Sequence, residues 1–599
     1  MRVRHNLLLT LLALGAAGSA ASAATIPVTT TADTIANDGQ CSLREAVLAA
    51  RFDQAVQGCA PGASGEDVIQ LEAAEYRLAA GGAGEDGNES GDLDTGPFNT
   101  LRIVGRGMNA TVVGAAGDRV FDVFTGASLG LADLTVRDGI APEGGSGGAV
   151  RSRGTLTALR VAFINNAAGK GHTPEDVGDD SGEGGGGGAI ASEGQLQVSD
   201  SVFSANRAGD SSNAGQLSGP GGSSTFSGGF AGDGGAILVS AGSASLANVT
   251  VSGSRVGDGT RGLELPNATI GGGGGGDGGG IAVTGGSATI VNATFQGNRA
   301  GNTTAPLPGS PGNGGAASVK APGALSITFS TFSGNASGSR AGAAPGVGAS
   351  VLGASVGGSI LADAGGACAT LAPASLVNVV LPGDPSCPGA KIAGDPRLGA
   401  LADNGGAVPT MLLGAGSPAI DAIVGVRCAA TDARGQIRPR FAGCDAGAVE
   451  IQPGSAAAPG GGGPGGGGAA ALRGLTALRV GPVAFRAAGR KPLGTTVTFQ
   501  LATASKVVLT VQRAAAGRKS GGRCVAPSKR LRSAKRCVRK VTLPGNVTKQ
   551  GIVGVNLIRF SGKLRGRALA PGPYTLVLTL PKAGAAAAVA LAKGFRIIR

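Results

Sequence analysis

Two acidic stretches of the chain carry the oxygen ligands that calcium prefers. The first contains Glu85, Asp86, Asn88, Glu89, Asp92 and Asp94, and the second contains Glu175, Asp176, Asp179, Asp180 and Glu183. Ca²⁺ is bound by carboxylate and amide oxygens, but neither stretch has the ligand spacing of an EF-hand loop. Two interpretations stay open for each stretch: a solvated acidic loop, or a calcium site with Asp86, Asp92 and Asp94 as the candidate ligands in the first. The sequence indicates no other cofactor.

Basic residues are concentrated at the other end of the chain. From Arg473 to Arg599 there are 26 lysines and arginines and no aspartate or glutamate, so the rest of the chain holds 51 − 26 = 25 basic and 38 acidic residues. Protein surfaces usually mix both signs, so this imbalance predicts an anionic partner, such as a cell-envelope polymer, a glycan, lipid headgroups or extracellular DNA. The densest group, expected to be the contact surface, is Lys529, Arg530, Arg532, Lys535, Arg536, Arg539 and Lys540. The sequence resembles no nucleic-acid fold with stacking aromatics, so we expect no sequence-specific nucleic-acid binding.

The eight cysteines form four neighbouring pairs along the chain. They are Cys41 with Cys59, Cys368 with Cys387, Cys428 with Cys444, and Cys524 with Cys537. An even number of cysteines at such spacings in an exported chain predicts local disulfides. Zinc is the alternative, but His172 is the only histidine after residue 23 and there is no CxxC motif, so the disulfides are favoured.

The N-terminal segment explains why export is expected. Residues 1–23 combine two arginines, an apolar run from Leu7 to Leu14 and small residues up to Ala23, which is the pattern of a secretory signal peptide. No later apolar stretch reaches the roughly 20 residues that a membrane helix needs. We therefore expect a secreted monomer that associates with the cell surface by other means, with no transmembrane helix in the mature chain.

A repeat of about 23 residues organises the centre of the chain. It begins at Gly147, Gly187, Gly234, Gly279 and Gly314, and each copy alternates apolar with polar or small residues. That alternation is the period of a half-buried strand, and the glycines mark corners. A single coil of short strands has nothing to cover its apolar face, so the repeat predicts a solenoid of stacked coils.

Equivalent positions of the five copies predict three columns along the stack. The apolar column, expected inside, is Phe163, Phe203, Val251, Phe295 and Phe332. The column expected to be an asparagine ladder, with a ligand-binding row as the alternative, is Asn166, Asn206, Ser254, Asn298 and Asn335. Side-chain amides at such turns satisfy backbone groups. The column expected to face solvent is Arg160, Asp200, Asn248, Asn292 and Phe329.

Glycine-rich inserts of variable length separate the coils, for example residues 184–188, 211–229 and 271–276. Loops that leave the same corner of every coil would line one side of the solenoid, where repeat proteins often bind partners. Disordered glycine decoration is the alternative.

The repeat resembles the right-handed parallel β-helix of the pectate lyase-like superfamily, over residues 98–365. Polysaccharide lyases of that superfamily place acidic calcium ligands and a basic residue on one outer face. The strand columns of this sequence show no such constellation. The resemblance thus implies the fold and leaves the activity open.

The segment before the repeat, residues 24–97, carries a helix signal. Leu43, Val47 and Leu48 have helical spacing, and Ser42 with Glu45 matches a capping box. The string from Cys41 to Ala50 resembles the motif of the CSLREA domain, found at the start of bacterial exported β-helix proteins. The resemblance implies an N-terminal module whose helix covers the open strand edges of the solenoid.

Residues 366–452 resemble the choice-of-anchor Q domain, through DPRLG from Asp395, GSPAID from Gly416 and CDAGAVE from Cys444. The resemblance implies the C-terminal part of the solenoid. Its charged residues invite an active-site interpretation: Asp421, Asp432, Arg434, Asp445 and Glu450. Turn-forming neighbours favour a structural role, with a buried Arg434 paired to a carboxylate.

The remaining chain predicts a linker and a second domain. Residues 453–471 are a Gly/Pro/Ala linker, and residues 472–599 contain six or seven short alternating stretches. That pattern is similar to immunoglobulin-like β-sandwich modules. The expected fold class is all-β: a right-handed parallel β-helix with an N-terminal capping helix, followed by a basic immunoglobulin-like sandwich.

These features favour a noncatalytic cell-surface or adhesion-type protein. The solenoid would be a display scaffold, and the basic sandwich would bind an anionic envelope polymer or glycan. A polysaccharide lyase or hydrolase on a pectate lyase-like scaffold is the alternative, and a structural matrix component is a third. No catalytic residue is assigned.

Overall fold

The computed structural model describes residues 23–598 with internal gaps. The gaps are residues 80, 83, 116, 173–181, 220–221, 304–308, 340–350, 364–367, 370–377, 382–390, 425–427, 453–474, 482–483, 488–493, 502–504, 521–522, 552–553 and 581–588. The chain divides into two units, Met1–Gly461 and Gly462–Arg599. The expected signal peptide, except Ala23, and the expected linker lie outside the described residues.

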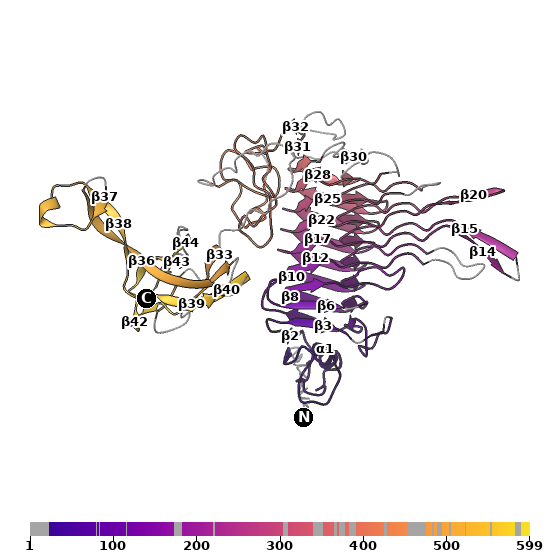
Figure 1. The fold of residues 1–599 in the computed structure, drawn as a ribbon, viewed down its shortest axis with the longest axis horizontal. Helices are drawn as coiled ribbons and strands as arrows, with labels where there is room; N and C mark the ends of the chain where they lie inside the picture. The colour runs from indigo at the N-terminus through magenta and orange to yellow at the C-terminus, as the bar shows by residue number, and fades with distance from the viewer. Residues whose placement is uncertain are drawn as a thin grey trace, which may run out of the picture. The chain divides into compact units, whose positions relative to one another are not determined.

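The first unit is a stack of parallel strands in two sheets (Figure 1). The nine-stranded sheet contains β4 (Leu93–Asp94), β7 (Phe121–Val123), β9 (Val150–Ser152), β11 (Ile190–Ser192), β16 (Ile237–Val239), β21 (Ile281–Val283), β24 (Ala317–Val319), β27 (Val351–Leu352) and β30 (Cys368–Ala369). The nineteen-stranded sheet contains β1 (Thr25–Pro27), β2 (Asp67–Gln70), β3 (Glu75–Leu78), β5 (Thr100–Val104), β6 (Val112–Ala115), β8 (Ser128–Arg137), β10 (Thr155–Ile164), β12 (Gln195–Ser199), β13 (Val202–Ser204), β17 (Ser243–Ala247), β18 (Thr250–Ser252), β22 (Ser287–Val291), β23 (Thr294–Gln296), β25 (Ala324–Thr328), β26 (Thr331–Ser333), β28 (Ser355–Gly357), β29 (Ile360–Ala362), β31 (Asn378–Val380) and β32 (Lys391–Ala393). The inserts add two hairpins, β14 (Gly215–Gly219) with β15 (Gly222–Phe226), and β19 (Leu263–Leu265) with β20 (Ala268–Ile270).

Each sequence repeat forms one coil of this stack. In the coil that begins at Gly187, β11 lies in the nine-stranded sheet, and β12 and β13 lie in the other. Neighbouring coils pair in register, so Leu196 lies opposite Leu156 on one side and Ala244 on the other. The prediction of an all-β parallel solenoid is confirmed.

The apolar column lies inside, as predicted. Its five side chains are fully buried and follow the strand register. The rings of Phe163 and Phe203 stack with centroids 4.9 Å apart, and those of Phe295 and Phe332 stack at 5.0 Å. Because each ring covers the next, the apolar core continues from coil to coil.

The asparagine ladder is also confirmed. Asn166 donates from Nδ2 to Oδ1 of Asn206 at 3.0 Å, and Asn298 donates to Oδ1 of Asn335 at 2.9 Å. Nδ2 of Asn206 also reaches the carbonyl of Phe163, 2.9 Å away, in the preceding coil. The buried amides therefore satisfy each other and the backbone of the turn.

The column expected to face solvent is only partly exposed. All five residues have φ between 49° and 58°, at the corner between the two strands that each coil gives to the nineteen-stranded sheet. Arg160 pairs with Asp133 at 2.6 Å near the surface, but Asn292 and Phe329 are 5 % and 4 % exposed. The solvent-facing prediction is wrong at these last two positions.

The cause of this burial is the segment after the last solenoid strand. The stack continues past residue 365 through β30, β31 and β32. Residues 394–452 then fold back along the side of the coils as turns and isolated bridges, where the sequence predicted more solenoid. Thr250 donates to the carbonyl of Pro409 at 2.6 Å, Asn292 donates to that of Thr431 at 2.9 Å, and the guanidinium of Arg438 lies 5.1 Å from the ring of Phe329.

The glycine-rich inserts pack on one another through their backbones. Two columns run along the stack: Gly169, Gly209, Gly257, Gly301 and Gly338, and Gly145, Gly185, Gly232, Gly276 and Gly312. The amide of Gly185 donates to the carbonyl of Gly169 at 2.7 Å, and the amide of Gly209 donates back to that of Gly185 at 2.8 Å. A Cβ on Gly209 would overlap the carbonyl oxygen of Gly169. The glycines of these two columns are thus packed by backbone contact, against the alternative of disordered decoration.

The N-terminal segment joins the same stack. Strand pairing begins at Thr25, which lies opposite Val68, so the coils start well before residue 98. Helix α1 (Leu43–Phe52) lies at the N-terminal end of the stack in Figure 1. Ser42 and Glu45 form the expected capping box, and the apolar face of α1 belongs to the solenoid core. Of the described helices, none is long and apolar enough to cross a membrane.

The second unit holds two sheets around one core. One sheet contains β33 (Leu475–Gly481), β35 (Thr495–Leu501) and β40 (Gly554–Phe560). The other contains β34 (Ala484–Phe485), β36 (Ser505–Ser520), β37 (Arg523–Val525), β38 (Arg536–Thr542), β39 (Val547–Gly551), β43 (Gly572–Leu580) and β44 (Val589–Ile597), and a short hairpin joins β41 (Lys563–Leu564) to β42 (Arg567–Ala568). Phe499 and Phe560 of the first sheet and Leu509, Leu578 and Phe595 of the second belong to one buried cluster.

Replacing Phe295 with alanine tests the apolar column. We expect Phe295→Ala to lower the free energy of unfolding by about 3–5 kcal/mol, because it removes a fully buried ring stacked on Phe332. Denaturant unfolding of the protein measures this. The matched control is Phe98→Ala, which removes an 83 % exposed ring and should change stability by less than about 0.5 kcal/mol. Equal losses for both variants would contradict the inward column.

Replacing Gly209 with alanine tests the glycine columns. Gly209→Ala should lower the unfolding free energy by about 1–3 kcal/mol, because the added methyl group meets a backbone carbonyl that has no rotamer to change. Gly271→Ala is the control, since a Cβ there meets nothing within 4 Å. Thermal unfolding compares the two, and a neutral Gly209→Ala would show that the inserts do not pack in this way.

Candidate functional site

The basic cluster lies on an arm of the second unit. The first half of β36 pairs with β39 and β43 over the core, whereas residues from Gln512 to Arg518 pair with β38. The strand then turns into β37, and the short helix η1 (Lys529–Leu531) connects β37 to β38. We call residues 513–541 the basic arm. Figure 1 shows its β37 and β38 end extending beyond the two packed sheets of this unit.

A disulfide fixes the end of the basic arm. Cys524 of β37 and Cys537 of β38 are joined, as predicted, across β36, which lies between them. The disulfide passes over Gly517, where a Cβ would meet both sulfur atoms. Arg518 adds a hydrogen bond from Nη1 to the carbonyl of Ala534, 2.7 Å away. Glycine at position 517 therefore leaves room for the disulfide that links β37 to β38 across β36.

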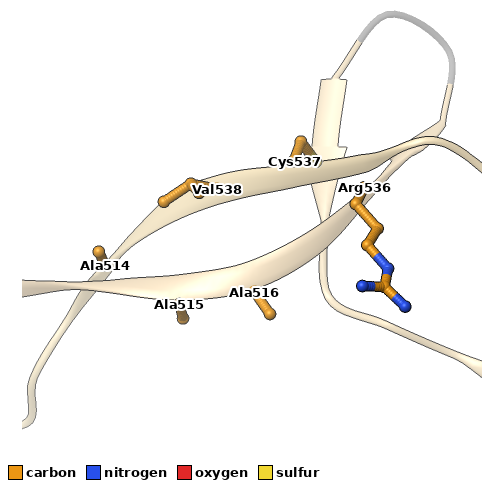
Figure 2. A pocket seen from close by; sticks show the side chains of 6 residues that line it. All are labelled: Ala514, Ala515, Ala516, Arg536, Cys537 and Val538. Carbon is orange, nitrogen blue, oxygen red and sulfur yellow. The ribbon is translucent and has the colours of Figure 1, made fainter.

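The predicted contact residues are brought together on this arm. Lys529, Arg530, Arg532, Lys535, Arg536 and Lys540 are exposed, and Arg539 is half-buried. Figure 2 shows Arg536 extending its guanidinium away from the strands, whereas the other labelled side chains, among them Ala514, Ala515, Ala516 and Val538, are short. Residues 473–599 contain no carboxylate side chain, so no acid of this segment neutralises the cluster. Its charge is available to an external anion.

The first acidic stretch forms a compact cluster in the first unit. Carboxylate oxygens of Asp86, Asp94 and Asp122 all lie within 4.8 Å of one another. Asp94 ends β4 and lies directly opposite Asp122 of β7 in the parallel register. Asp92, the third sequence candidate, turns toward Arg119 at 3.3 Å. The structure thus brings two of the three candidates together and adds Asp122.

Burial distinguishes this cluster from a solvated loop. Asp94 and Asp122 are 0 % and 1 % exposed, and only Asp86 of the three is exposed. Burial raises the pKa of Asp92 to about 7, with Arg119 acting in the opposite direction. Burial raises the pKa of Asp94 to about 8, and the neighbouring carboxylates Asp92, Asp122, Glu85 and Asp86 raise it further.

Sequence reasoning missed Asp122 because it lies in the next coil, 28 positions after Asp94. The signal that could have found it is the strand register, which aligns Asp94, Asp122 and Arg151 across β4, β7 and β9.

The second acidic stretch, apart from Glu183, lies outside the described residues. Cys387 also lies outside the described residues, so the predicted Cys368–Cys387 disulfide stays a prediction. The disulfides Cys41–Cys59 and Cys428–Cys444 are present as predicted.

The charged residues of segment 394–452 have structural partners. Arg434 is buried and donates to Asp432 at 2.8 Å and to the carbonyl of Glu450 at 2.6 Å, as the structural interpretation predicted. Arg438 donates to the carbonyls of Asp445 and Gly447. These groups hold the irregular segment together.

No protein-family model, curated protein or solved structure matches the chain.

The buried carboxyl of Asp445 predicts a pH dependence of stability. Burial raises the pKa of this carboxyl to about 6. The negative charge of Glu450 also raises it, whereas hydrogen bonds from the amides of Ile451 and Asp421 and the positive charge of Arg438 lower it. Because the folded pKa exceeds the unfolded value, this group stabilises the fold below about pH 4 and loses that contribution as the pH rises to about 6. Thermal unfolding between pH 4 and pH 7 should show this decline in the wild type and a smaller one in Asp445→Asn. The same pH profile for both proteins would contradict it.

Proposed function

We propose that this protein is an exported, noncatalytic cell-surface or adhesion-type protein whose basic arm binds an anionic polymer of the cell envelope or an anionic glycan. The observation that carries the proposal is the exposed cationic cluster on a disulfide-fixed arm, in a segment without a single carboxylate side chain. The solenoid would then be the part that the anchored protein displays.

The shape of the basic arm suits an extended polyanion. Residues of β38 alternate between exposed and half-buried, so neither face of the strand is covered by a core. Successive residues of a strand point to opposite faces, so Arg539 and Lys540 present charge on both sides. Ala514, Ala515 and Ala516 of β36, which lie beside Arg536, have short side chains. A polymer with repeated negative charges can follow such a surface without a shaped pocket.

The acidic cluster of the solenoid does not offer an accessible pair of carboxylates to the lyase or hydrolase alternative. Asp94 and Asp122 are closed off from solvent, so a saccharide cannot reach the paired carboxylates that a lyase or hydrolase would need. The polysaccharide-cleaving alternative therefore has no supporting observation among the described residues.

The finer assignments belong to the same proposal. Disulfides support an oxidising, exported environment. The buried Arg44 of α1, which donates to Asp33 and to the carbonyls of Ser90, Gly91 and Asp92, supports a CSLREA-type capping module. The right-handed coil direction, the choice-of-anchor Q relationship of the segment that folds back and the immunoglobulin-like topology of the second unit are proposed on the sequence resemblances.

Binding of the mature chain to an immobilised polyanion tests the function. We expect binding to polyphosphate or a sulfated glycan but not to neutral dextran, with affinity falling steeply as salt rises, because exposed charges are screened beyond roughly 8 Å at physiological ionic strength. Replacing Lys529, Arg530, Lys535 and Arg536 together by glutamine should weaken binding by about tenfold or more. Circular dichroism should stay unchanged, since these side chains are exposed.

The matched control removes the same charge elsewhere in the unit. Arg559, Lys563, Arg565 and Arg567 are exposed outside the arm, and their replacement by glutamine should reduce affinity much less. Equal losses for both quadruple variants would assign binding to the overall charge and not to the arm. Binding that is insensitive to salt would overturn the electrostatic proposal.

A further inference from the structure

We propose that Asp86, Asp94 and Asp122 bind one calcium ion, which holds the acidic loop of residues 85–92 against the first coils of the solenoid. This site is independent of the anion-binding function. The geometry fits a single ion: oxygens that ligate the same Ca²⁺ at about 2.3–2.6 Å lie at most about 5 Å apart. The three carboxylates meet that limit, with all ligand atoms within 4.8 Å.

The buried oxygens of the cluster point to a ligand. Both carboxylate oxygens of Asp94 and Oδ1 of Asp122 are buried and have no hydrogen-bond partner among the described residues. Buried carboxylates are costly when they are unpaired, and a metal ion is one of the usual ways in which proteins compensate them. One cation held by this cluster would compensate the three unpartnered oxygens of Asp94 and Asp122.

The other oxygen of Asp122, Oδ2, is bound by arginine side chains. Oδ2 of Asp122 pairs with Arg151, with Arg153 at 3.4 Å and with Arg119 at 3.8 Å. These guanidinium groups bind Oδ2 and leave Oδ1 without a hydrogen-bond partner among the described residues. Arginine thus orients Asp122 without filling the space between Asp94 and Asp86.

The loop is positioned before any ion binds. Asn88 has φ 64°, accepts from the amide of Asp94 at 2.8 Å and donates to its carbonyl at 2.6 Å. From α1, Arg44 donates to the carbonyl of Gly91 at 2.8 Å, and Arg51 donates to that of Asp86 at 3.1 Å. An ion at this place would join α1, the loop, β4 and β7.

The donor set selects calcium among common cations. All three side chains offer oxygen and none offers nitrogen or sulfur, which disfavours zinc. Asp94 has both oxygens free and can bind in the bidentate mode that calcium accepts. Magnesium prefers an octahedral shell that keeps several waters, and two of the three carboxylates are closed to solvent. The exposed side of Asp86 is the entry path and the place for water ligands.

Calorimetry and thermal unfolding of the mature chain test the site. After treatment with EDTA, the wild type should bind one Ca²⁺ per chain, bind Mg²⁺ at least about tenfold more weakly, and unfold several degrees higher in Ca²⁺ than in EDTA. Asp94→Asn should lose both the binding and the Ca²⁺-dependent shift. In EDTA it should unfold at or above the wild-type temperature, because it removes a buried carboxyl without changing its shape.

Two further variants distinguish specific Ca²⁺ binding at this site from a general attraction of cations to the acidic loop. Glu89→Gln removes a negative charge from the same loop but no ligand of the cluster, so its Ca²⁺ affinity should stay within about twofold of the wild type. Asp86→Asn, whose side chain is exposed, should fold normally and bind at least about tenfold more weakly. These margins separate the loss of a ligand from the loss of one surface charge. A wild type with equal unfolding temperatures in Ca²⁺ and EDTA and no binding heat would overturn the proposal, as would equal affinity in Asp94→Asn or equal affinity for Mg²⁺.

Discussion

A coil of this solenoid buries its apolar side chains against the coils on either side. The register between coils therefore determines which side chains are buried and which residues form the corners. A slip of one residue would turn Phe203 and its neighbours from the core to the surface. The repeated corner at Arg160, Asp200 and Asn248, with its positive φ, and the asparagine ladder beside it both recur at fixed register positions. Packing, corner geometry and buried hydrogen bonds therefore select the same alignment.

The acidic cluster depends on that alignment, whereas the basic arm, in the second unit, does not. Asp94 and Asp122 meet because register places residues of successive coils opposite each other. The basic arm meets no such neighbour, because β36 continues past the core that its first half covers. The first arrangement concentrates charge inside a rigid stack, and the second presents charge to the surroundings.

Sequence reasoning found what repeats and missed what does not. The five-fold repeat sufficed to predict the parallel solenoid, the inward column of Phe295 and the asparagine ladder, since each position is sampled five times. The burial of Asn292 and Phe329 comes from contacts with residues more than 100 positions away, which no local period encodes. Phe329 was nevertheless a signal, because it is the one apolar residue in an otherwise polar column. Asp122 was missed for a related reason: its partner is set by strand pairing and not by spacing along the chain.

The glycine columns change how the composition of this chain should be understood. With 113 glycines in 599 residues, the inserts read as low complexity, which usually accompanies mobile segments. Here the amides of Gly185, Gly209 and Gly232 donate to the carbonyls of Gly169, Gly185 and Gly209, respectively. Hydrogen exchange at these glycines would then be as slow as in the neighbouring strands, although they have no side chains and lie outside the strands. Glycine in these columns acts as the tightest possible packing unit, and a segment that composition marks as loose becomes part of the rigid body.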